Sequence, residues 1–514
     1  MRSKFLCILL LLGLKAEAQM RAAWIHGRSE HFEMFSATDL QESQLLLAEL
    51  ELFHAALQTM FGNPTVQSNR TTVVVFRFDE DLRNYKPVFD GKPSDADAFF
   101  IGGPDETLIT FAVNQPLDYT KELIYHEYTH QFFHSLGITM PLWMNEGLAE
   151  YFSTVVVKKD RIEFGADKPA HRAVLDHYAM LPLERVFAIG PDSQDYNEGL
   201  RQGIFYAESW ALIHFWLCGE DRTNYLKFLK FSELLDLPGS EPATCFQEAF
   251  SMDYKAMQTL LAKHIQGGRY LIRKIPRPAG IMAEQLKFAP AVPFERDFIL
   301  ENLRVRTQAN PLSAERLLRL AERAPDSPRP YEALAALAML HQDPDTAQSH
   351  WRKAAELGSE NPYVYLMGAK PELEQIMQNA PLDYRMPKEQ AAVLRASLRH
   401  AIKLNPGYQL AYEALAQLES VAQKPSIAAA NQVQAVLPSM REKARTVLAL
   451  AVVRWRLNDH ATCLQMIELL LASAGVPDDV RSTALLLKDR IDQSALIQPI
   501  PPPQELQAEP AGSR

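Results

Sequence analysis

Residues 125–130 read YHEYTH and residues 143–151 read WMNEGLAEY, and these two stretches decide how the chain is interpreted. The first contains the pattern H-E-x-x-H within an apolar-periodic run that predicts a helix over residues 121–136. Residues four apart share one face of a helix, so His126 and His130 present their imidazoles to a single point. Two histidines in this spacing predict a metal site, because neutral imidazole is the commonest side-chain ligand of metals in proteins.

Three glutamates complete the predicted site. Glu127, beside the first histidine, is placed to reach a water held at the metal and to act as its general base. Glu146 lies on the second predicted helix and is placed to be the third ligand. Two imidazoles, one carboxylate and an open water position are typical of catalytic zinc, of which we expect one ion per chain. Glu150 follows one helical turn after Glu146 and is expected to orient a ligand histidine from behind.

The same residues have plainer interpretations. His126 and His130 are alternatively ordinary polar residues of a half-exposed helix, and Glu150 a solvated helix residue. His134 continues the histidine row, but about 12 Å of helix axis separates it from His126, because each of the eight intervening steps rises 1.5 Å. One ion cannot bind both residues. We therefore interpret His134 as a packing residue or as one that contacts a ligand from outside.

The two motifs resemble those of the gluzincin metallopeptidases, the group that includes thermolysin-like and aminopeptidase-N-like enzymes. The chain is similar in particular to the bacterial peptidase-MA-like group, formerly the DUF1570 type, which often carries helical repeats after its catalytic domain. The resemblance covers roughly residues 24–265 and is specific only around the two motifs. It implies zinc ligands at His126, His130 and Glu146, a general base at Glu127 and an acid behind a ligand at Glu150.

The resemblance also implies a candidate for stabilising the oxyanion. Aminopeptidase-N-like gluzincins place a tyrosine on a helix at a comparable distance after the third ligand, and Tyr206 is the matching candidate here. A phenolic O–H near the metal can donate to a developing negative oxygen. The alternative is that Tyr206 packs in the core. Those enzymes also carry a G-x-M-E-N motif that holds the free amino terminus of the substrate. Residues 102–106 read GGPDE in that region, so we expect an endopeptidase.

Upstream of the zinc helix the pattern predicts a small sheet. An opening strand over residues 24–35 precedes a helix over residues 38–61, whose apolar residues recur at helical spacing. Further strands are predicted at residues 71–78, 98–101 and 108–113. The strand 108–113 either offers a free edge to an extended peptide substrate or pairs only within its own sheet.

Beyond residue 300 the composition shifts to alanine and leucine at helical periods. The small and large positions of a tetratricopeptide repeat are matched by Tyr331, Leu334, Ala335, Ala338, Ala347, Trp351 and Ala354. The pattern returns out of step because residues 368–388 insert extra chain, and residues 441–471 predict one more helix pair. Stacked helical hairpins need small residues where helices cross. The alternative is an irregular helical bundle.

These features give an expected fold class of α+β, in which a thermolysin-like zincin catalytic domain is followed by an all-α tetratricopeptide-like domain. The expected domains are a signal peptide (1–18), the metallopeptidase domain (19–265), a connector (266–300), the helical repeats (301–492) and a Pro-rich disordered tail (493–514). The length of 514 residues suits two or three domains, and 47% apolar content is that of a globular protein.

Composition also limits the partners and the location. The net charge of −10 and the absence of a basic run give no reason to expect nucleic acid. No stretch after the N-terminus reaches the roughly 18 to 20 apolar residues of a membrane span. A basic start, an apolar run over residues 5–14 and Ala16-Glu17-Ala18 predict a secretory signal cleaved after Ala18. We therefore expect a secreted or periplasmic protein, although a retained membrane anchor is the alternative reading of the same run.

Three cysteines remain after this cleavage, Cys218, Cys245 and Cys463. Export permits a single bridge between Cys218 and Cys245, and the plainer interpretation is three small buried residues.

The sequence thus predicts a secreted or periplasmic zinc metallopeptidase that acts on peptides or proteins, with a repeat domain that offers a surface to a protein partner. The competing hypothesis is an interaction protein whose repeats bind a partner and whose metal site is structural or idle. Glu127 discriminates between them, because a structural zinc site is closed by four protein ligands and needs no general base.

Overall fold

The computed structural model describes residues 24–496 apart from short gaps at 63–69, 90, 95, 114–116, 137, 139, 198, 236–239, 280–281, 441–442 and 474–475. The predicted signal peptide and the predicted tail beyond residue 496 lie outside the described residues. The described chain mixes α and β elements, as expected, and divides into two compact units. Unit 1 is Met1–Ala369 with Arg399–Tyr408, and unit 2 is Lys370–Leu398 with Gln409–Arg514.

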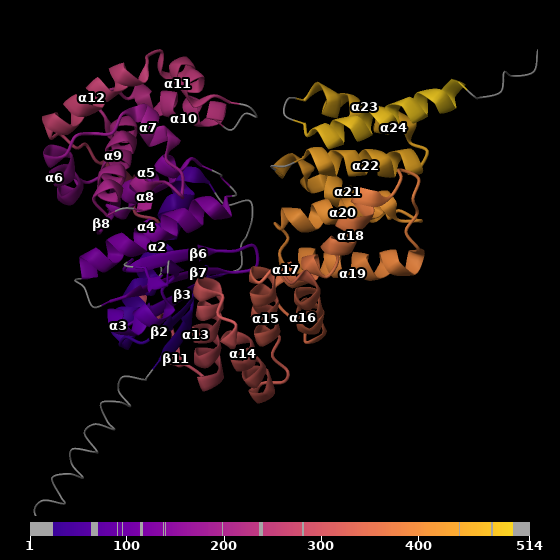
Figure 1. Cartoon of the computed structure of the whole chain (residues 1–514), viewed down its shortest axis with the longest axis horizontal. Helices are drawn as coiled ribbons and strands as arrows, with labels where there is room; N and C mark the ends of the chain where they lie inside the picture. Colours follow the sequence, from indigo (N-terminus) through magenta and orange to yellow (C-terminus); the bar gives the residue numbers. More distant parts are fainter. Residues whose placement is uncertain are drawn as a thin grey trace, which may run out of the picture. The chain divides into compact units, whose positions relative to one another are not determined.

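A six-stranded mixed sheet organises unit 1 (Figure 1). Its strand order is β11 (Phe288–Pro290), β1 (Ile25–Arg28), β2 (Phe32–Ser36), β3 (Thr71–Phe76), β7 (Thr107–Ala112) and β6 (Ala98–Gly102). The three central strands β2, β3 and β7 run parallel, and the outer strands pair antiparallel to their neighbours. Strands β3 and β7 are buried along their whole length, as expected of parallel strands that are covered on both faces.

Two features of this sheet bear on the predictions. The single opening strand predicted over residues 24–35 is wrong, because the segment folds into the antiparallel hairpin β1–β2, closed by a bond from the Ser29 N–H to the Phe32 carbonyl. Of the two placements left open for the strand at 108–113, the structure has the interior one, since β7 lies between β3 and β6. The free edge on this side of the sheet is therefore β6, which precedes β7 in the chain.

Helices cover both faces of the sheet. Alternate residues of a strand point to opposite faces, so each strand contributes to two cores. Helices α2 (Leu40–Phe61) and α4 (Leu117–Ser135) pack on the first face against Phe32, Met34, Val73, Val75 and Ile109. Helix α13 (Pro293–Gln308) packs Ile299 and Leu303 on the second face, against Phe35, Val74 and Phe76. Helix α13, which spans the predicted boundary between connector and repeats, is thus part of the core of the sheet.

The rest of unit 1 is mainly helical. The elements near the sheet are α3 (Asp79–Leu82), η1 (Arg83–Tyr85), β4 (Val88–Phe89) and β5 (Lys92–Pro93). After α4 follow α5 (Leu142–Ser153), β8 (Val156–Val157), β9 (Arg161–Phe164), α6 (Pro169–His177), α7 (Leu183–Ala188), α8 (Gln194–Asn197), α9 (Gly199–Cys218), α10 (Thr223–Leu235), α11 (Pro242–Phe250) and α12 (Tyr254–Gly267). Then come β10 (Arg273–Pro276), which joins β9 and β8 in a small sheet, η2 (Ala283–Gln285), α14 (Leu312–Arg323), α15 (Arg329–Leu340), α16 (Pro344–Glu356) and α17 (Pro362–Met367).

Unit 2 consists of helices. They are α18 (Lys370–Asn379), the first part of α19 (Lys388–Leu404), α20 (Gln409–Val421), α21 (Ile427–Val436), η3 (Leu437–Ser439), α22 (Ala444–Arg456), α23 (His460–Ala472) and α24 (Asp478–Leu496). The helix pair predicted over residues 441–471 is present as α22 and α23. In unit 1, α15 and α16 form a hairpin in which the predicted small residues Ala347 and Ala354 are fully buried. The assignment of these hairpins to the tetratricopeptide type stays a prediction.

Two further predictions concern a disulfide bridge and membrane-spanning helices. Cys218, Cys245 and Cys463 are each buried and free, so the bridge between Cys218 and Cys245 is absent and the plainer interpretation holds. Among the helices that the structure describes, none is both long enough and apolar enough to cross a membrane.

The contact between α5 and α9 is unusually close at Gly147. A Cβ atom there would lie 2.6 Å from the Ser209 carbonyl oxygen and 2.7 Å from Ile213 Cγ1. Glycine permits this approach of two helix backbones because it has no side chain. The contact fixes α5, which carries Glu146 and Glu150, against the helix that carries Tyr206.

Replacing Gly147 with alanine tests this packing. We expect Gly147→Ala to lower the apparent midpoint of thermal unfolding, because overpacking a core contact costs about 1–3 kcal/mol. Gly203→Ala on α9 is the matched control, since a Cβ at Gly203 meets no atom within 4 Å. The control should be neutral or slightly stabilising, because alanine is favoured over glycine within a helix. Equal midpoints for the two variants would contradict the close contact.

Candidate metal centre

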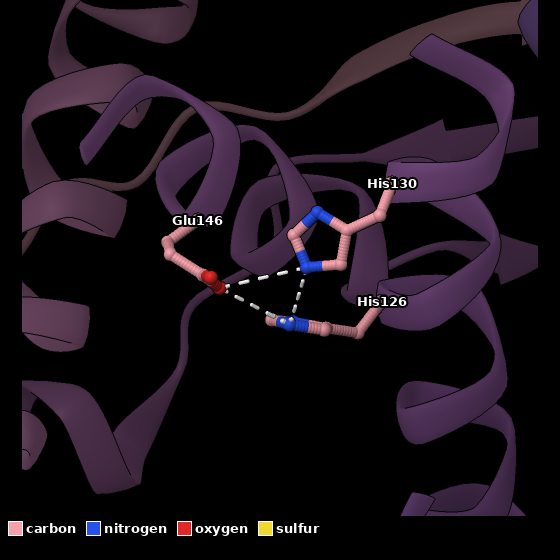
Figure 2. Close-up of side chains that lie close together, drawn as sticks. All are labelled: His126, His130 and Glu146. Carbon is pink, nitrogen blue, oxygen red and sulfur yellow. Dashed lines mark hydrogen bonds and ion pairs between the residues drawn. The ribbon is translucent and has the colours of Figure 1, made fainter. Parts of the chain in front are cut away.

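The H-E-x-x-H residues lie on α4, and the geometry brings the two histidines together as the spacing predicts. His126 Nε2 and His130 Nε2 are 3.1 Å apart. Glu146 reaches them from α5, with its Oε2 atom 3.4 Å from His126 Nε2 and 3.5 Å from His130 Nε2. Figure 2 shows the three side chains turned toward one another between the two helices. All three predicted ligands therefore meet at one point.

The space between these atoms has the dimensions of a metal site. Ligand atoms held about 2.0–2.2 Å from a tetrahedral ion lie about 3.3–3.6 Å from one another. The Glu146 side chain is buried, and its Oε2 atom has no hydrogen-bond partner among the described residues. Leaving a buried carboxylate oxygen without a partner is costly, and a cation between it and the imidazoles removes that cost. These residues fit a divalent ion, and two imidazoles with one carboxylate suit zinc.

The described residues supply three ligands at this point. His126, His130 and Glu146 are the only His, Cys, Asp or Glu side chains of the described chain that gather in a group of three or more with ligand atoms within 4.8 Å of one another. A tetrahedral ion held here therefore keeps a position for water or substrate.

Glu127 lies beside the ligands without joining them. Its carboxylate accepts a hydrogen bond from the backbone N–H of Phe100 on the edge strand β6. Burial raises the pKa of Glu127, and the neighbouring charges of His126 and His130 oppose this rise. A fixed carboxylate with a raised pKa is suited to accept a proton and to give it back near neutral pH.

Glu150 lies behind His126, as predicted. Its Oε1 atom is 3.3 Å from His126 Nδ1, and its Oε2 atom accepts from His171 Nε2 at 2.7 Å and from the Lys168 ammonium. Burial alone would raise the pKa of Glu150, but hydrogen bonds from His126 and His171 hold it well below its usual range. A carboxylate on the Nδ1 side places the ring proton on Nδ1 and leaves the Nε2 lone pair for an ion. Glu150 thus lies beside a predicted ligand, and its role in orienting that ligand stays a prediction.

Lys168 and His171 were not predicted from the sequence to belong to the site. Lys168 directly precedes α6, and His171 lies in its first turn. Both meet Glu150 only because α6 packs against α9, and no local spacing signals such a contact. With His126 they place three cationic or hydrogen-bonding groups around the buried carboxylate of Glu150.

Two tyrosines stand beside the ligands. The ring of Tyr206 stacks over the imidazole of His126, with centroids 6.3 Å apart and planes at 20°, so Tyr206 does lie at the predicted site. Tyr196 stacks on Tyr206, with ring centroids 6.0 Å apart and planes at 10°. Tyr196 Oη donates to Glu146 Oε1 at 3.1 Å and accepts a hydrogen bond from the Tyr206 hydroxyl. Burial raises the pKa of both phenols, so both remain hydrogen-bond donors.

Tyr196 was also not predicted from the sequence to belong to the site. It lies on the short helix α8, fifty residues after Glu146, and the chain has 17 tyrosines with no motif to single it out. His134, by contrast, is where the helical spacing places it. Its exposed ring packs edge-to-face on Phe100 at 6.1 Å, which agrees with the packing interpretation.

Residues 122–236 are similar to a family described as "protein of unknown function (DUF1570)". The matched segment covers less than half of the chain. It contains every residue of the metal centre described above: His126, Glu127, His130, Glu146, Glu150, Lys168, His171, Tyr196 and Tyr206. No curated protein matches the chain.

The bond from Tyr196 to Glu146 predicts an effect on metal affinity. In Tyr196→Phe the carboxylate loses the donor that holds its outer oxygen, so we expect zinc to bind about tenfold more weakly. Competition with a chromophoric zinc chelator measures this. Tyr178→Phe is the matched control because Tyr178 is exposed and stands outside the centre. An unchanged affinity in Tyr196→Phe would show that the bond does not position the ligand.

Proposed function

We propose that this chain is a zinc-dependent metallopeptidase that cleaves internal peptide bonds with a zinc-activated water. The observation that carries the proposal is the convergence of His126, His130 and Glu146 on one point, with the carboxylate of Glu127 beside it and outside the ligand set. Three ligands and a free carboxylate support hydrolysis, since a closed structural site needs a fourth ligand and no base.

The residues around this point have distinct roles in the proposed reaction. Zinc, when bound, supplies Lewis-acid chemistry that polarises the scissile carbonyl and acidifies a water. Glu127 accepts the proton of the attacking water and delivers it to the leaving amine. The Phe100 N–H keeps the Glu127 carboxylate turned toward the reaction. Glu150 keeps His126 in the tautomer that binds an ion.

The tyrosine pair suits the negative charge that develops during hydrolysis. Tyr206 lies against His126, and we propose that its O–H donates to the substrate oxygen as that charge grows. Tyr196 positions both Tyr206 and Glu146 through its two hydrogen bonds. Burial raises the pKa of Tyr206, so its phenol stays protonated, and its O–H, which donates to Tyr196 in this structure, would turn to the substrate oxygen.

Strand β6 supports a peptide as the substrate. Among the described residues β6 pairs as a strand with β7 alone, and it contacts α4, where its Phe100 N–H donates to Glu127. An extended peptide that adds to this edge strand would lie next to Glu127. The acids of the turn after β6 are already engaged, Asp105 by Arg306 and Glu106 by Asn302, so neither of these two is available to capture a free amino terminus. This favours the endopeptidase assignment.

The location and the repeat domain belong to the same proposal. We propose that the protein acts outside the cytoplasm, on the strength of the predicted signal, and that the C-terminal helices offer a surface to a protein partner. The competing function, an interaction protein with a structural metal site, requires a closed ligand set, whereas the described residues provide three ligands.

The decisive variant for this proposal is Glu127→Gln, which keeps the shape of the side chain and removes its basicity. We expect about one zinc per chain in the wild type and in the variant, with the cleavage rate of unfolded casein lower in the variant by about 10²–10⁴-fold, the usual contribution of a general base. Asp118→Asn is the matched control, because Asp118 is an exposed acid on the same helix.

The control should bind zinc and cleave casein as the wild type does. Zinc in all three proteins with full activity in Glu127→Gln would exclude Glu127 as the base. Absence of zinc from all three would remove the basis of the proposal.

A further inference from the structure

A large cavity lies on the side of α4 that faces away from the metal centre. Its volume is about 1240 Å³, and all of its lining residues belong to unit 1. Tyr128, Gln131 and Ser135 of α4 line it. These residues recur at intervals of three and four on the helix face opposite to His126 and His130. No ligand of the metal centre lines this cavity, and neither does Glu127.

Two walls enclose the cavity. The first is formed by the β1–β2 hairpin, α2, α4, the start of β3 and the turn between β6 and β7. The second is formed by α13 and α15, whose lining residues Phe298, Asn302 and Arg306 on α13 recur every four residues along one face. Helices α14 and α16 contribute no lining residue. Alternate helices of stacked hairpins that present one face in this way form the extended binding surfaces of helical arrays.

The lining carries an excess of negative charge. Eight carboxylates and four guanidiniums line the cavity, which gives a net charge of −4 with neutral histidines. The carboxylates are Glu30, Glu33, Glu51, Asp105, Glu106, Asp326, Glu332 and Glu360, and the guanidiniums are Arg28, Arg70, Arg306 and Arg329. Two of the arginines are already bound within the wall, Arg306 to Asp105 at 2.8 Å and Arg28 to Glu33 at 2.7 Å. The remaining acids therefore exceed the cations available to them.

Two glutamates deep in the wall show the effect of this excess. Glu106 accepts from Asn302 Nδ2 at 2.6 Å, and Glu332 accepts from Ser359 Oγ at 2.5 Å. Burial raises the pKa of both carboxyls, and the negative charge of Asp105 adds to the rise. A cation placed in the cavity would favour the ionised form of both groups.

Several lining side chains also have unmet hydrogen-bonding capacity. His54, Gln131 and Asn302 are each more than nine-tenths buried. Within the described part of the chain His54 Nε2, Gln131 Oε1 and Asn302 Oδ1 have no hydrogen-bond partner. A buried polar group without a partner is destabilising. This wall is therefore suited to a polar ligand and unsuited to an apolar one.

We propose that this cavity binds a basic peptide segment, an extended stretch of chain whose lysine or arginine side chains pair with the lining carboxylates. The volume exceeds the roughly 300–1,000 Å³ that is typical of small-molecule sites, which favours a peptide over a metabolite. The face shared by α13 and α15 provides a surface along which an extended chain can lie. The site is separate from the metal centre and does not depend on bound zinc.

Fluorescence anisotropy of a labelled ten-residue peptide of alternating lysine and alanine tests the proposal. The full chain carrying Glu127→Gln is titrated with zinc present and after chelation, so that cleavage and metal do not confuse the reading. We expect the same affinity in both conditions, weaker binding at higher salt, and no binding of the matching glutamate–alanine peptide. Binding that disappears on chelation would place the peptide at the metal centre and overturn the proposal.

The site itself is tested with charge-removing variants. Asp326→Asn/Glu360→Gln neutralises two exposed lining acids and should not disturb folding, and Glu332→Gln neutralises a half-buried one. The matched control Glu315→Gln/Asp345→Asn removes the same charge from α14 and α16, outside the cavity. We expect affinity to fall about tenfold in the cavity variants, because the removed carboxylates would pair directly with lysines of the bound peptide. We expect a fall of less than about twofold in the control, because its acids lie outside the cavity and attract the peptide only through screened long-range charge.

Three outcomes would overturn the proposal. An equal loss in cavity and control variants would show attraction to net charge alone. No binding of the lysine peptide would remove the site. Full displacement of the peptide by spermidine at the same concentration of positive charge would show a site for small organic cations in place of a peptide. None of these outcomes bears on zinc content or casein cleavage, so the proposed hydrolytic function stands or falls separately.

Discussion

The structure depends on the burial of two carboxylates on one helix, Glu146 and Glu150 of α5. Buried carboxylates are costly unless they are paired. Glu150 is paired with His126, His171 and Lys168, which directly precedes α6, and these contacts offset the cost of its burial. Glu146 has one oxygen bound by Tyr196, while the other lies 3.4 Å and 3.5 Å from two imidazole nitrogens and has no hydrogen-bond partner within the described chain. The remaining demand for positive charge is therefore concentrated at the point where a metal ion would lie.

The surrounding fold fixes the positions of the helices that carry these carboxylates and their partners. The close contact of α5 with α9 at Gly147 sets α5 at a fixed distance from the helix that carries Tyr206. The sheet positions α4 on its first face, and its edge strand β6 reaches Glu127 through the Phe100 N–H. Helix α13 closes the second face of the same sheet. The helices after the predicted connector thus begin as part of the unit that holds the metal centre.

The part of the site that the sequence predicted is the part set by local spacing. His126 and His130 are one helical turn apart, and so are Glu146 and Glu150, so their relative directions follow from the helix itself. The placement of Glu146 on the following helix as a third ligand was predicted from the residues and is also implied by the resemblance to gluzincins, and in the structure Glu146 of α5 lies 3.4 Å and 3.5 Å from the two imidazole nitrogens of α4. Tyr196, Lys168 and His171 reach the site through tertiary packing, and such contacts leave no periodic trace in the chain. The same holds for the strand order, in which β6 takes the edge and β7 the interior.

Whether His126, His130 and Glu146 hold a catalytic zinc ion is tested most directly by anomalous diffraction at the zinc absorption edge, from crystals of the full chain grown with zinc. We expect one strong peak per chain between His126 Nε2, His130 Nε2 and the Glu146 carboxylate, about 2.0–2.2 Å from each ligand atom and with a non-protein ligand in the remaining position. No peak at this point, or a peak there with a fourth protein ligand, would contradict a catalytic zinc centre.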